Sequence, residues 1–239
     1  MNKAMTITTS DFLKSVPVER TNTYTPISHR QIIDETLFLF KKHGLTVQNE
    51  LYTECLDGKI AQGNYTLNVQ DSEMALELVW QNSTNKQVSF KYAIGSRIFA
   101  CTNGCIYGDL DAYKRIHKGT ADTEAIQKMN EFVSKMESNF QNMITIRDRM
   151  KEIEVTKRTC AELIGRLFAE EEIISITQVG IIKRELENPS FDYGVENSLW
   201  NFYQHCTHSF KEITPRVWLP KQIELSKFLT TEYQELELV

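Results

Sequence analysis

The chain has 239 residues, of which 41% are hydrophobic and 25% charged, and a net charge of −5 at neutral pH. These proportions are those of a globular protein with a buried core. The acidity excludes a uniformly basic coat for nucleic acid but leaves room for a local basic groove. Apolar runs are shorter than the about 18–20 residues that cross a bilayer, and residues 1–20 lack the apolar centre of a signal peptide. We therefore expect no membrane partner.

The 5 cysteines are an odd number and are widely spaced. Such a set argues against a disulfide framework and for a reducing compartment. The expected location is therefore the cytoplasm.

Residues 1–24 are polar and contain Pro17, which predicts an N-terminal arm. The rest, 25–239, is predicted to be a single α+β domain. Its first element is a helix, because Ser28 and Gln31 have capping-box spacing, apolar residues then recur at helical spacing, and Gly44 provides a stop.

From residue 45 the pattern changes to the alternation of β-strands. Asp57-Gly58 predicts a tight hairpin, and the polar residues 82–85 predict a second turn. Residues 97–102 are predicted to form one more short strand. Together these signals predict an antiparallel β-meander that completes a β-rich half, about 25–119.

The helical half is expected at about 120–230, ahead of an acidic tail, and begins with a long helix capped by Asp122 or Thr123. Its apolar seam consists of Ile126, Met129, Val133, Met136, Phe140 and Met143. Since only about three heptads are present, a core stripe is favoured over a free coiled coil. The fold class is therefore α+β: an N-terminal helix and an antiparallel meander, then a long helix and a mostly helical C-terminal half.

Further helices are predicted at 156–171 and 175–188, and another one is capped by Asn197. Pro215 and Pro220 are predicted to bracket a turn before a short helix at 222–229. The acidic run 170–172 is interpreted as a solvated loop or helix end, because consecutive helical residues point in different directions.

Four basic residues lie close together before the long helix. This basic cluster comprises Lys114, Arg115, His117 and Lys118. With the exposed amides at the helix start, it could bind phosphate. Lys91 and Arg97 could extend the patch, and Tyr107 and Tyr113 offer rings for base stacking. A solvated basic loop that balances nearby aspartates is an equally weighted alternative.

Metal binding and catalysis have weaker signals. Two cysteines and two histidines, Cys101, Cys105, His205 and His208, could form a zinc site, but their spacing matches no strong zinc signature. Buried free cysteines and structural histidines are the favoured interpretation, and no cofactor is expected. The chain has no nucleophile elbow, P-loop, H-E-x-x-H or G-x-G-x-x-G motif, so no catalytic residue is assigned.

Several motifs occur in an order that resembles the phage/plasmid-like family catalogued as domain of unknown function 932. They are YTPISHRQIIDE, NST before a strand, RIFACTNG, KRIHKG before the long helix, and SLWNFYQHCTH. The resemblance covers about residues 24–228 and implies a mobile-element origin, hence a bacterial host cell. Where such proteins often read Asn-Ser-x-Asp-Gly, this chain ends the motif with Lys86, so that turn should change conformation or lose its glycine-dependent geometry.

The order of helix, β-meander and long helix is also similar in outline to the single-strand annealing core of the Rad52-like superfamily. The function expected is binding of single-stranded DNA without catalysis, with annealing of complementary strands as an extension and a homo-oligomer as the working form. The alternative is a protein-interaction component, such as a virion, assembly or anti-defence factor, that acts through its long helix. An enzyme on nucleotides or nucleic acid is the third hypothesis.

Overall fold

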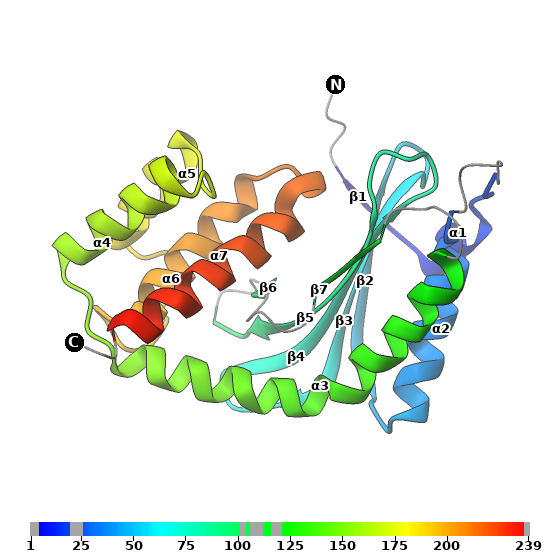
Figure 1. Ribbon diagram of the computed structural model, residues 1–239, viewed down its shortest axis with the longest axis horizontal. Coiled ribbons are helices and arrows are strands. Elements are labelled where there is room, and N and C mark those ends of the chain that lie inside the picture. The colour runs from blue at the N-terminus through cyan, green and yellow to red at the C-terminus, as the bar shows by residue number, and fades with distance from the viewer. Residues whose placement is uncertain (1–4, 20–25, 101–103, 106–111, 116–120, 237–239) are drawn as a thin grey trace. The chain divides into compact units, whose positions relative to one another are not determined.

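The computed structural model describes residues 5–19, 26–100, 104–105, 112–115 and 121–236 (Figure 1). The chain divides into two compact units, where the sequence predicted one domain after an arm. The first unit consists of Met1–Ser96 and Leu110–Asn139, and the second of Arg97–Asp109 and Phe140–Val239. The α+β class is confirmed, because a meander with N-terminal helices precedes a long helix and a helical C-terminal part. No helix among the described residues is long and apolar enough to cross a membrane.

The sheet of the described chain has the order β1-β2-β3-β4-β5-β6, and β7 also pairs with β5. Its strands are β1 (Thr6–Thr8), β2 (Val47–Cys55), β3 (Ile60–Gln70), β4 (Met74–Ser83), β5 (Phe90–Ile98), β6 (Gly104–Cys105) and β7 (Ala112–Arg115). The predicted meander corresponds to β2–β5. The separate strand predicted at 97–102 is wrong, because Arg97 and Ile98 are the last residues of β5.

The first hairpin turn is the predicted one. Leu56, Asp57 and Gly58 all have positive φ, at 59°, 57° and 78°. The Gly58 amide donates to Glu54 Oε2 at 2.7 Å, which ties the turn to the end of β2. This confirms the Asp-Gly signal, since a tight turn needs residues that tolerate the left-handed region.

The second hairpin turn begins later than predicted, because β4 runs to Ser83. The Ser83 hydroxyl closes the turn by donating to the Val88 carbonyl at 2.7 Å and accepting from the Val88 amide at 2.9 Å. Lys86 has φ 70°. Lysine thus keeps the left-handed conformation that glycine adopts freely, at a cost of roughly 1 kcal/mol.

Helix α2 (His29–Lys42) begins and ends as predicted. The Ser28 hydroxyl accepts a hydrogen bond from the Gln31 amide at 3.0 Å. Gly44 follows the helix with φ 75°, so the left-handed stop is also confirmed.

Part of the predicted N-terminal arm is packed on the first unit. Strand β1 pairs antiparallel with β2, and helix α1 (Ser10–Ser15) packs on α2. Leu13 is fully buried, and Lys14 forms an ion pair with Asp34 at 2.7 Å. Sequence patterns miss this packing because a three-residue strand is too short to show alternation.

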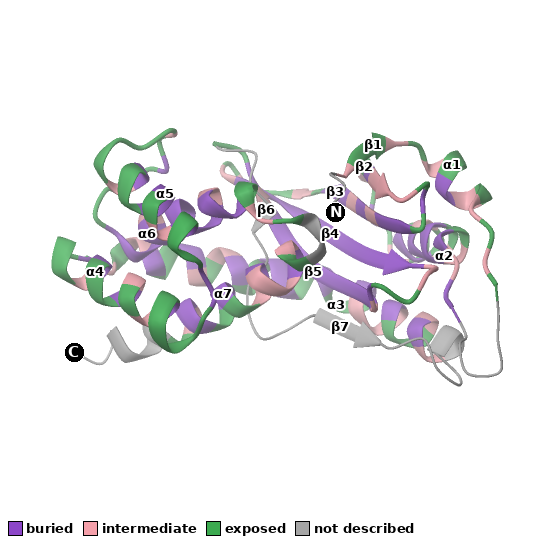
Figure 2. Ribbon diagram, turned by 90° about the horizontal axis from the view of Figure 1, so that it is seen from above, coloured by how far each residue is buried: buried purple, intermediate pink, exposed green. Residues whose placement is uncertain are grey.

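One side of the sheet forms the core of the first unit, beneath α2 and the start of α3 (Ala121–Glu152) (Figure 1). The rings of Phe40 and Tyr65 meet edge to face with centroids 5.5 Å apart, and those of Tyr92 and Phe132 are 6.0 Å apart. Thr36 Oγ1 is within 3.1 Å of the Tyr92 hydroxyl. Figure 2 shows β4 and β5 as buried along nearly all of their length.

The second unit is helical. It contains Phe140–Glu152 of α3, then α4 (Lys157–Gly165), a π-helical turn (Arg166–Glu170), α5 (Ile176–Glu187), α6 (Leu199–Ser209), a 3₁₀ turn (Phe210–Glu212) and α7 (Pro215–Leu236). The helices predicted at 156–171 and 175–188 are confirmed, with Thr156 and Ser175 as caps. Residues 170–172 are exposed, as the interpretation as a solvated helix end predicted.

Two predictions for the C-terminal part are wrong. Helix α6 is capped by Ser198, whose hydroxyl accepts from the Asn201 amide at 3.1 Å, whereas Asn197 has φ 55° and precedes the cap. Pro215 and Pro220 both lie in α7 and do not bracket a turn. Pro215 suits the first helical position, where its missing amide hydrogen costs nothing.

The apolar seam of α3 is a core stripe, as predicted. Met129, Val133, Met136, Phe140 and Met143 have exposed fractions of 1%, 2%, 0%, 1% and 4%. Ile126, at the start of the seam, is partly exposed.

Candidate functional site

Two residues of the basic cluster expected before the long helix, Lys114 and Arg115, lie in strand β7. In β7, Lys114 lies directly opposite Lys91 of β5, and Arg115 lies opposite Phe90. Because successive strand positions belong to opposite sides of a sheet, Lys114 and Arg115 do not share a side by register. The structure therefore brings Lys91 and Lys114 together.

Lys91 belongs to the side of the sheet opposite the aromatic core. It is 8% exposed, and its Nζ donates to Gln81 Oε1 at 2.8 Å. Gln81 is the register partner of Gln62 on β3, whose Nε2 donates to Asn64 Oδ1 at 3.1 Å. A row of hydrogen-bonding side chains therefore runs from β3 to Lys91.

The other predicted binding residues are not shown beside the pair of Lys91 and Lys114. Arg97 lies near the end of β5, is partly exposed and belongs to the second unit. Tyr113 lies opposite Tyr92 by register. Tyr107, His117 and Lys118 lie outside the described residues.

The predicted zinc ligands are described only in part. Cys101 and the side chain of Cys105 lie outside the described residues, and His205 and His208 lie on α6. Within the described chain, no group of three or more His, Cys, Asp or Glu side chains could hold a metal ion. The two histidines instead flank Glu185 of α5.

Two cysteines of the second unit, Cys160 and Cys206, are free and buried. Burial raises the pKa of both thiols. Neither is therefore suited to act as a thiolate nucleophile.

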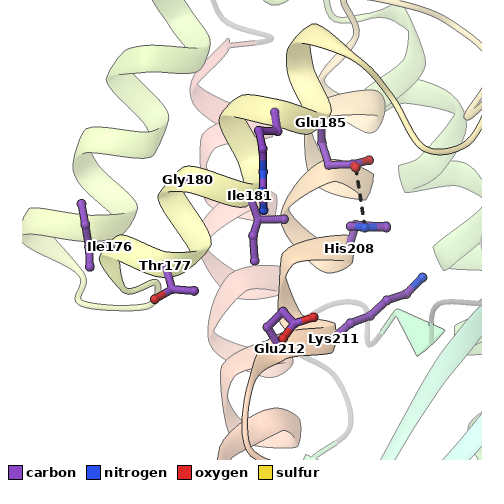
Figure 3. A pocket seen from close by; sticks show the side chains of 9 residues that line it. Ile176, Thr177, Gly180, Ile181, Glu185, His208, Lys211 and Glu212 are labelled. Atoms are coloured by element: carbon purple, nitrogen blue, oxygen red, sulfur yellow. Dashed lines mark ion pairs between the residues drawn. The ribbon is translucent and has the colours of Figure 1, made fainter.

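A pocket of about 760 Å³ lies between α5 and α6 (Figure 3). We call it the α5–α6 pocket. It combines an apolar wall with side chains of both charges, and its lining is Ile176, Thr177, Gly180, Ile181, Arg184, Glu185, His208, Lys211 and Glu212. Figure 3 shows Glu185 and His208 pointing toward one another from the two helices. Binding pockets have this size and this mixture of apolar surface and few polar groups.

Glu185 is buried, with 6% of the residue exposed. Its carboxylate is hydrogen-bonded by Ser190, which follows the end of α5. The Ser190 amide donates to its Oε2 at 3.1 Å, and the Ser190 hydroxyl donates to its Oε1 at 2.5 Å. His208 Nε2 is 3.6 Å from Oε1, and His205 Nδ1 is 3.8 Å from Oε2. Both separations are too long for a direct hydrogen bond.

The charge state of this trio follows from burial and its neighbours. Burial lowers the pKa of His205 to about 4, although Glu185 opposes the shift. Burial also lowers the pKa of His208, again against the pull of Glu185. For Glu185, burial raises the pKa, but the Ser190 hydrogen bonds and the histidines outweigh it, so the pKa is lowered. At neutral pH the Glu185 carboxylate thus lies beside two largely neutral imidazoles, of which His208 lines the pocket.

Such a site can accept and donate hydrogen bonds to a polar ligand while Arg184 and Lys211 supply positive charge. Sequence reasoning identified His205 and His208 by their spacing on one helix. It missed Glu185, because a glutamate among charged residues of an amphipathic helix looks like a solvated position. Its only sequence signal is the nearby Ser190, just after the helix-ending Pro189.

Comparison with known proteins gives one family match. A family model described as Domain of unknown function (DUF932) matches residues 19–216. No curated protein and no solved structure matches the chain.

Proposed function

We propose that this chain, which belongs to the family described as Domain of unknown function (DUF932), binds single-stranded DNA without catalysing a reaction, and that this binding supports the annealing of complementary strands. The observation that carries the proposal is the placement of Lys114 opposite Lys91 across β7 and β5. A phage or plasmid origin, a homo-oligomeric form and the cytoplasm of a bacterial host belong to the same proposal.

Two lysines directly opposite each other are unfavourable in an isolated sheet. Opposed residues of antiparallel strands have Cβ atoms about 4.5–5.5 Å apart, and like charges at that distance repel. A phosphate backbone lying across the pair removes the repulsion and releases counterions. The hydrogen bond that Lys91 Nζ donates to Gln81 Oε1 fixes where its ammonium group lies.

The topology adds a supporting analogy. Helix α2, the meander β2–β5 and the long helix α3 follow one another in the order of Rad52-like annealing cores. Similarity of topology does not transfer function, so the proposal depends on the lysine pair.

The test is filter binding of a labelled oligothymidylate to the whole 239-residue chain over a range of salt concentrations. The variants are Lys114→Gln and the double variant Lys91→Gln/Lys114→Gln. The affinity falls as salt rises, so the slope of log K against log salt is negative. Removing one lysine–phosphate interaction should make this slope shallower by about 0.7 for a single strand. The double variant should therefore have a slope shallower by about 1.4, and it should bind more weakly at every salt concentration.

The matched control is Lys135→Gln, which removes an exposed lysine from α3. Its affinity and salt slope should equal those of the unmodified chain. Absence of oligonucleotide retention at low salt contradicts the proposal, and so does an equal loss of affinity in the control and in the double variant.

A protein-interaction role through the long helix has less support. The seam that would form the interface is buried, and Trp200 and Tyr203 of α6 are each 1% exposed. These side chains are already used in packing.

A further inference from the structure

We propose that the α5–α6 pocket binds a small phosphorylated sugar, either free or as part of a nucleotide. This inference goes beyond binding of a DNA strand, because it concerns a soluble ligand and only residues of the second unit. Three features of the pocket carry it: a carboxylate and an imidazole that face each other without touching, two cationic side chains, and an apolar wall.

The first feature calls for a ligand with hydroxyl groups. Glu185 Oε1 and His208 Nε2 are 3.6 Å apart, and His208 Nδ1 is buried with no hydrogen-bond partner in the described structure. Polar groups at such a separation are commonly bridged by a third group. A sugar hydroxyl is both a donor and an acceptor, so it can donate to the carboxylate and accept from His208 Nε2 when that nitrogen carries the imidazole proton.

The second feature calls for an anion on the same ligand. Arg184 and Lys211 line the pocket, and Lys211 Nζ is positioned over the Phe191 ring, 4.9 Å from its centroid. The first turn of α5 is already capped, since the Ser175 hydroxyl accepts from the Thr177 amide. An anion in the pocket is therefore held by the cationic side chains, as phosphates commonly are.

The mixed charge of the lining argues against a bare phosphate. Glu212 and Glu185 bring as many negative charges as Arg184 and Lys211 bring positive ones. A ligand that offers hydroxyls to the carboxylates and phosphate to the cations fits both halves. The apolar wall of Ile176 and Ile181 can cover the carbon skeleton or a base, and the volume of about 760 Å³ accommodates a nucleoside monophosphate.

The test is isothermal titration calorimetry of the whole chain with ribose 5-phosphate, adenosine monophosphate, ribose and inorganic phosphate. One of the two phosphorylated sugars should bind at least about tenfold more tightly than ribose or phosphate alone, because charged hydrogen bonds and hydroxyl contacts add. Tighter binding of the nucleotide identifies a nucleotide site, and equal affinities identify a sugar-phosphate site.

Three variants locate the binding. Arg184→Gln and Lys211→Gln should each weaken it by about tenfold or more, and Glu185→Gln should weaken it while ribose 5-phosphate loses its advantage over phosphate. Arg158→Gln is the matched control, since it removes an exposed arginine of α4 whose side chain is 89% exposed. This control should bind like the unmodified chain.

Two results overturn the proposal. One is the absence of heat with every probe at millimolar concentration. The other is unchanged affinity in both Arg184→Gln and Lys211→Gln, which alter exposed side chains and are therefore expected to fold normally. Because these two variants decide the result, the proposal stays testable even if Glu185→Gln unfolds. The oligonucleotide test of the lysine pair uses other residues, so the two proposals fail independently.

Discussion

Two buried polar clusters, one in each unit, differ in how their groups are hydrogen-bonded. In the first unit, the Tyr65 hydroxyl accepts hydrogen bonds from the Tyr52 hydroxyl at 3.1 Å and from Trp80 Nε1 at 3.3 Å. In the second unit, Glu185 and its two histidines are separated by 3.6 and 3.8 Å. The tyrosine and tryptophan side chains thus bond one another directly, whereas the gaps beside Glu185 leave room for the bridging hydroxyl proposed above.

Gly63 of the sheet and Gly165 of the helical unit differ in the space around them. A Cβ on Gly63 of β3 would lie 2.4 Å from Trp80 Nε1, whereas a Cβ on Gly165 of α4 would meet nothing within 4 Å. A methyl group would therefore overlap a side chain at Gly63, whereas the exposed Gly165 has open space around it.

The largest expected effect comes from placing a charge in the α3 seam. Met136→Asp puts a carboxylate at a position with 0% exposure, and an unpaired buried charge should cost at least about 3–5 kcal/mol. Urea denaturation followed by circular dichroism measures the loss of stability. Ser138→Asp, on the exposed side of the same helix, should cost little. A folded Met136→Asp chain that merely changed its oligomeric state would make the seam an interface.

The second prediction concerns pH and the second unit. Between the ordinary pKa of 6.5 and the folded pKa of about 4 for His205, the unfolded chain takes up a proton that the folded chain does not. The free energy of unfolding should therefore fall as the pH falls through this window, by up to about 3 kcal/mol. The lowered pKa of Glu185 acts in the same direction. His205→Asn should flatten the profile measured by urea denaturation, and an unchanged slope would refute the assignment.

The third prediction compares glycine-to-alanine substitutions at Gly63 and Gly165. Gly63→Ala should destabilise the chain by about 1–3 kcal/mol, because the added methyl group overlaps the Trp80 ring. Gly165→Ala should stabilise it by roughly 0.5–1 kcal/mol, because alanine is the better helix former and the space is open. Thermal unfolding of both variants measures the two signs. Equal signs would remove the contrast.

The smallest effects are expected at the helix caps, where the two units should not differ. Ser28→Ala and Ser198→Ala each remove a hydroxyl that accepts from an amide in the first turn of the helix. Each should cost about 1 kcal/mol. A much larger cost at Ser198, measured by urea denaturation, would show that this cap also supports the packing of α6.

Local signals in the sequence predicted most of the fold. The Ser28 cap, the Gly44 stop and the Asp57-Gly58 hairpin depend on neighbouring residues, and such interactions are encoded within one turn. The α+β class followed from the change of periodicity near residue 45.

The elements that sequence reasoning missed depend on distant partners. Strand β7 has no apolar alternation and is defined by its pairing with β5. Pro220 looked like a helix breaker, yet α7 contains it. The α5–α6 pocket requires Glu185 and His208 to meet from two helices, and no spacing rule connects them. For the same reason the lysine pair became visible only through strand register.

Strand β1 has a practical consequence for anyone who shortens the chain. It is 3 residues long and covers the edge of β2, which is 9 residues long. A chain that starts after Thr8 would lose the pairing to Tyr52, Thr53 and Glu54, which leaves β2 without a partner along this edge. Long uncovered strand edges recruit other chains. We expect such a truncated protein to aggregate during expression, whereas the untruncated chain keeps its sheet closed at this end by only three residues.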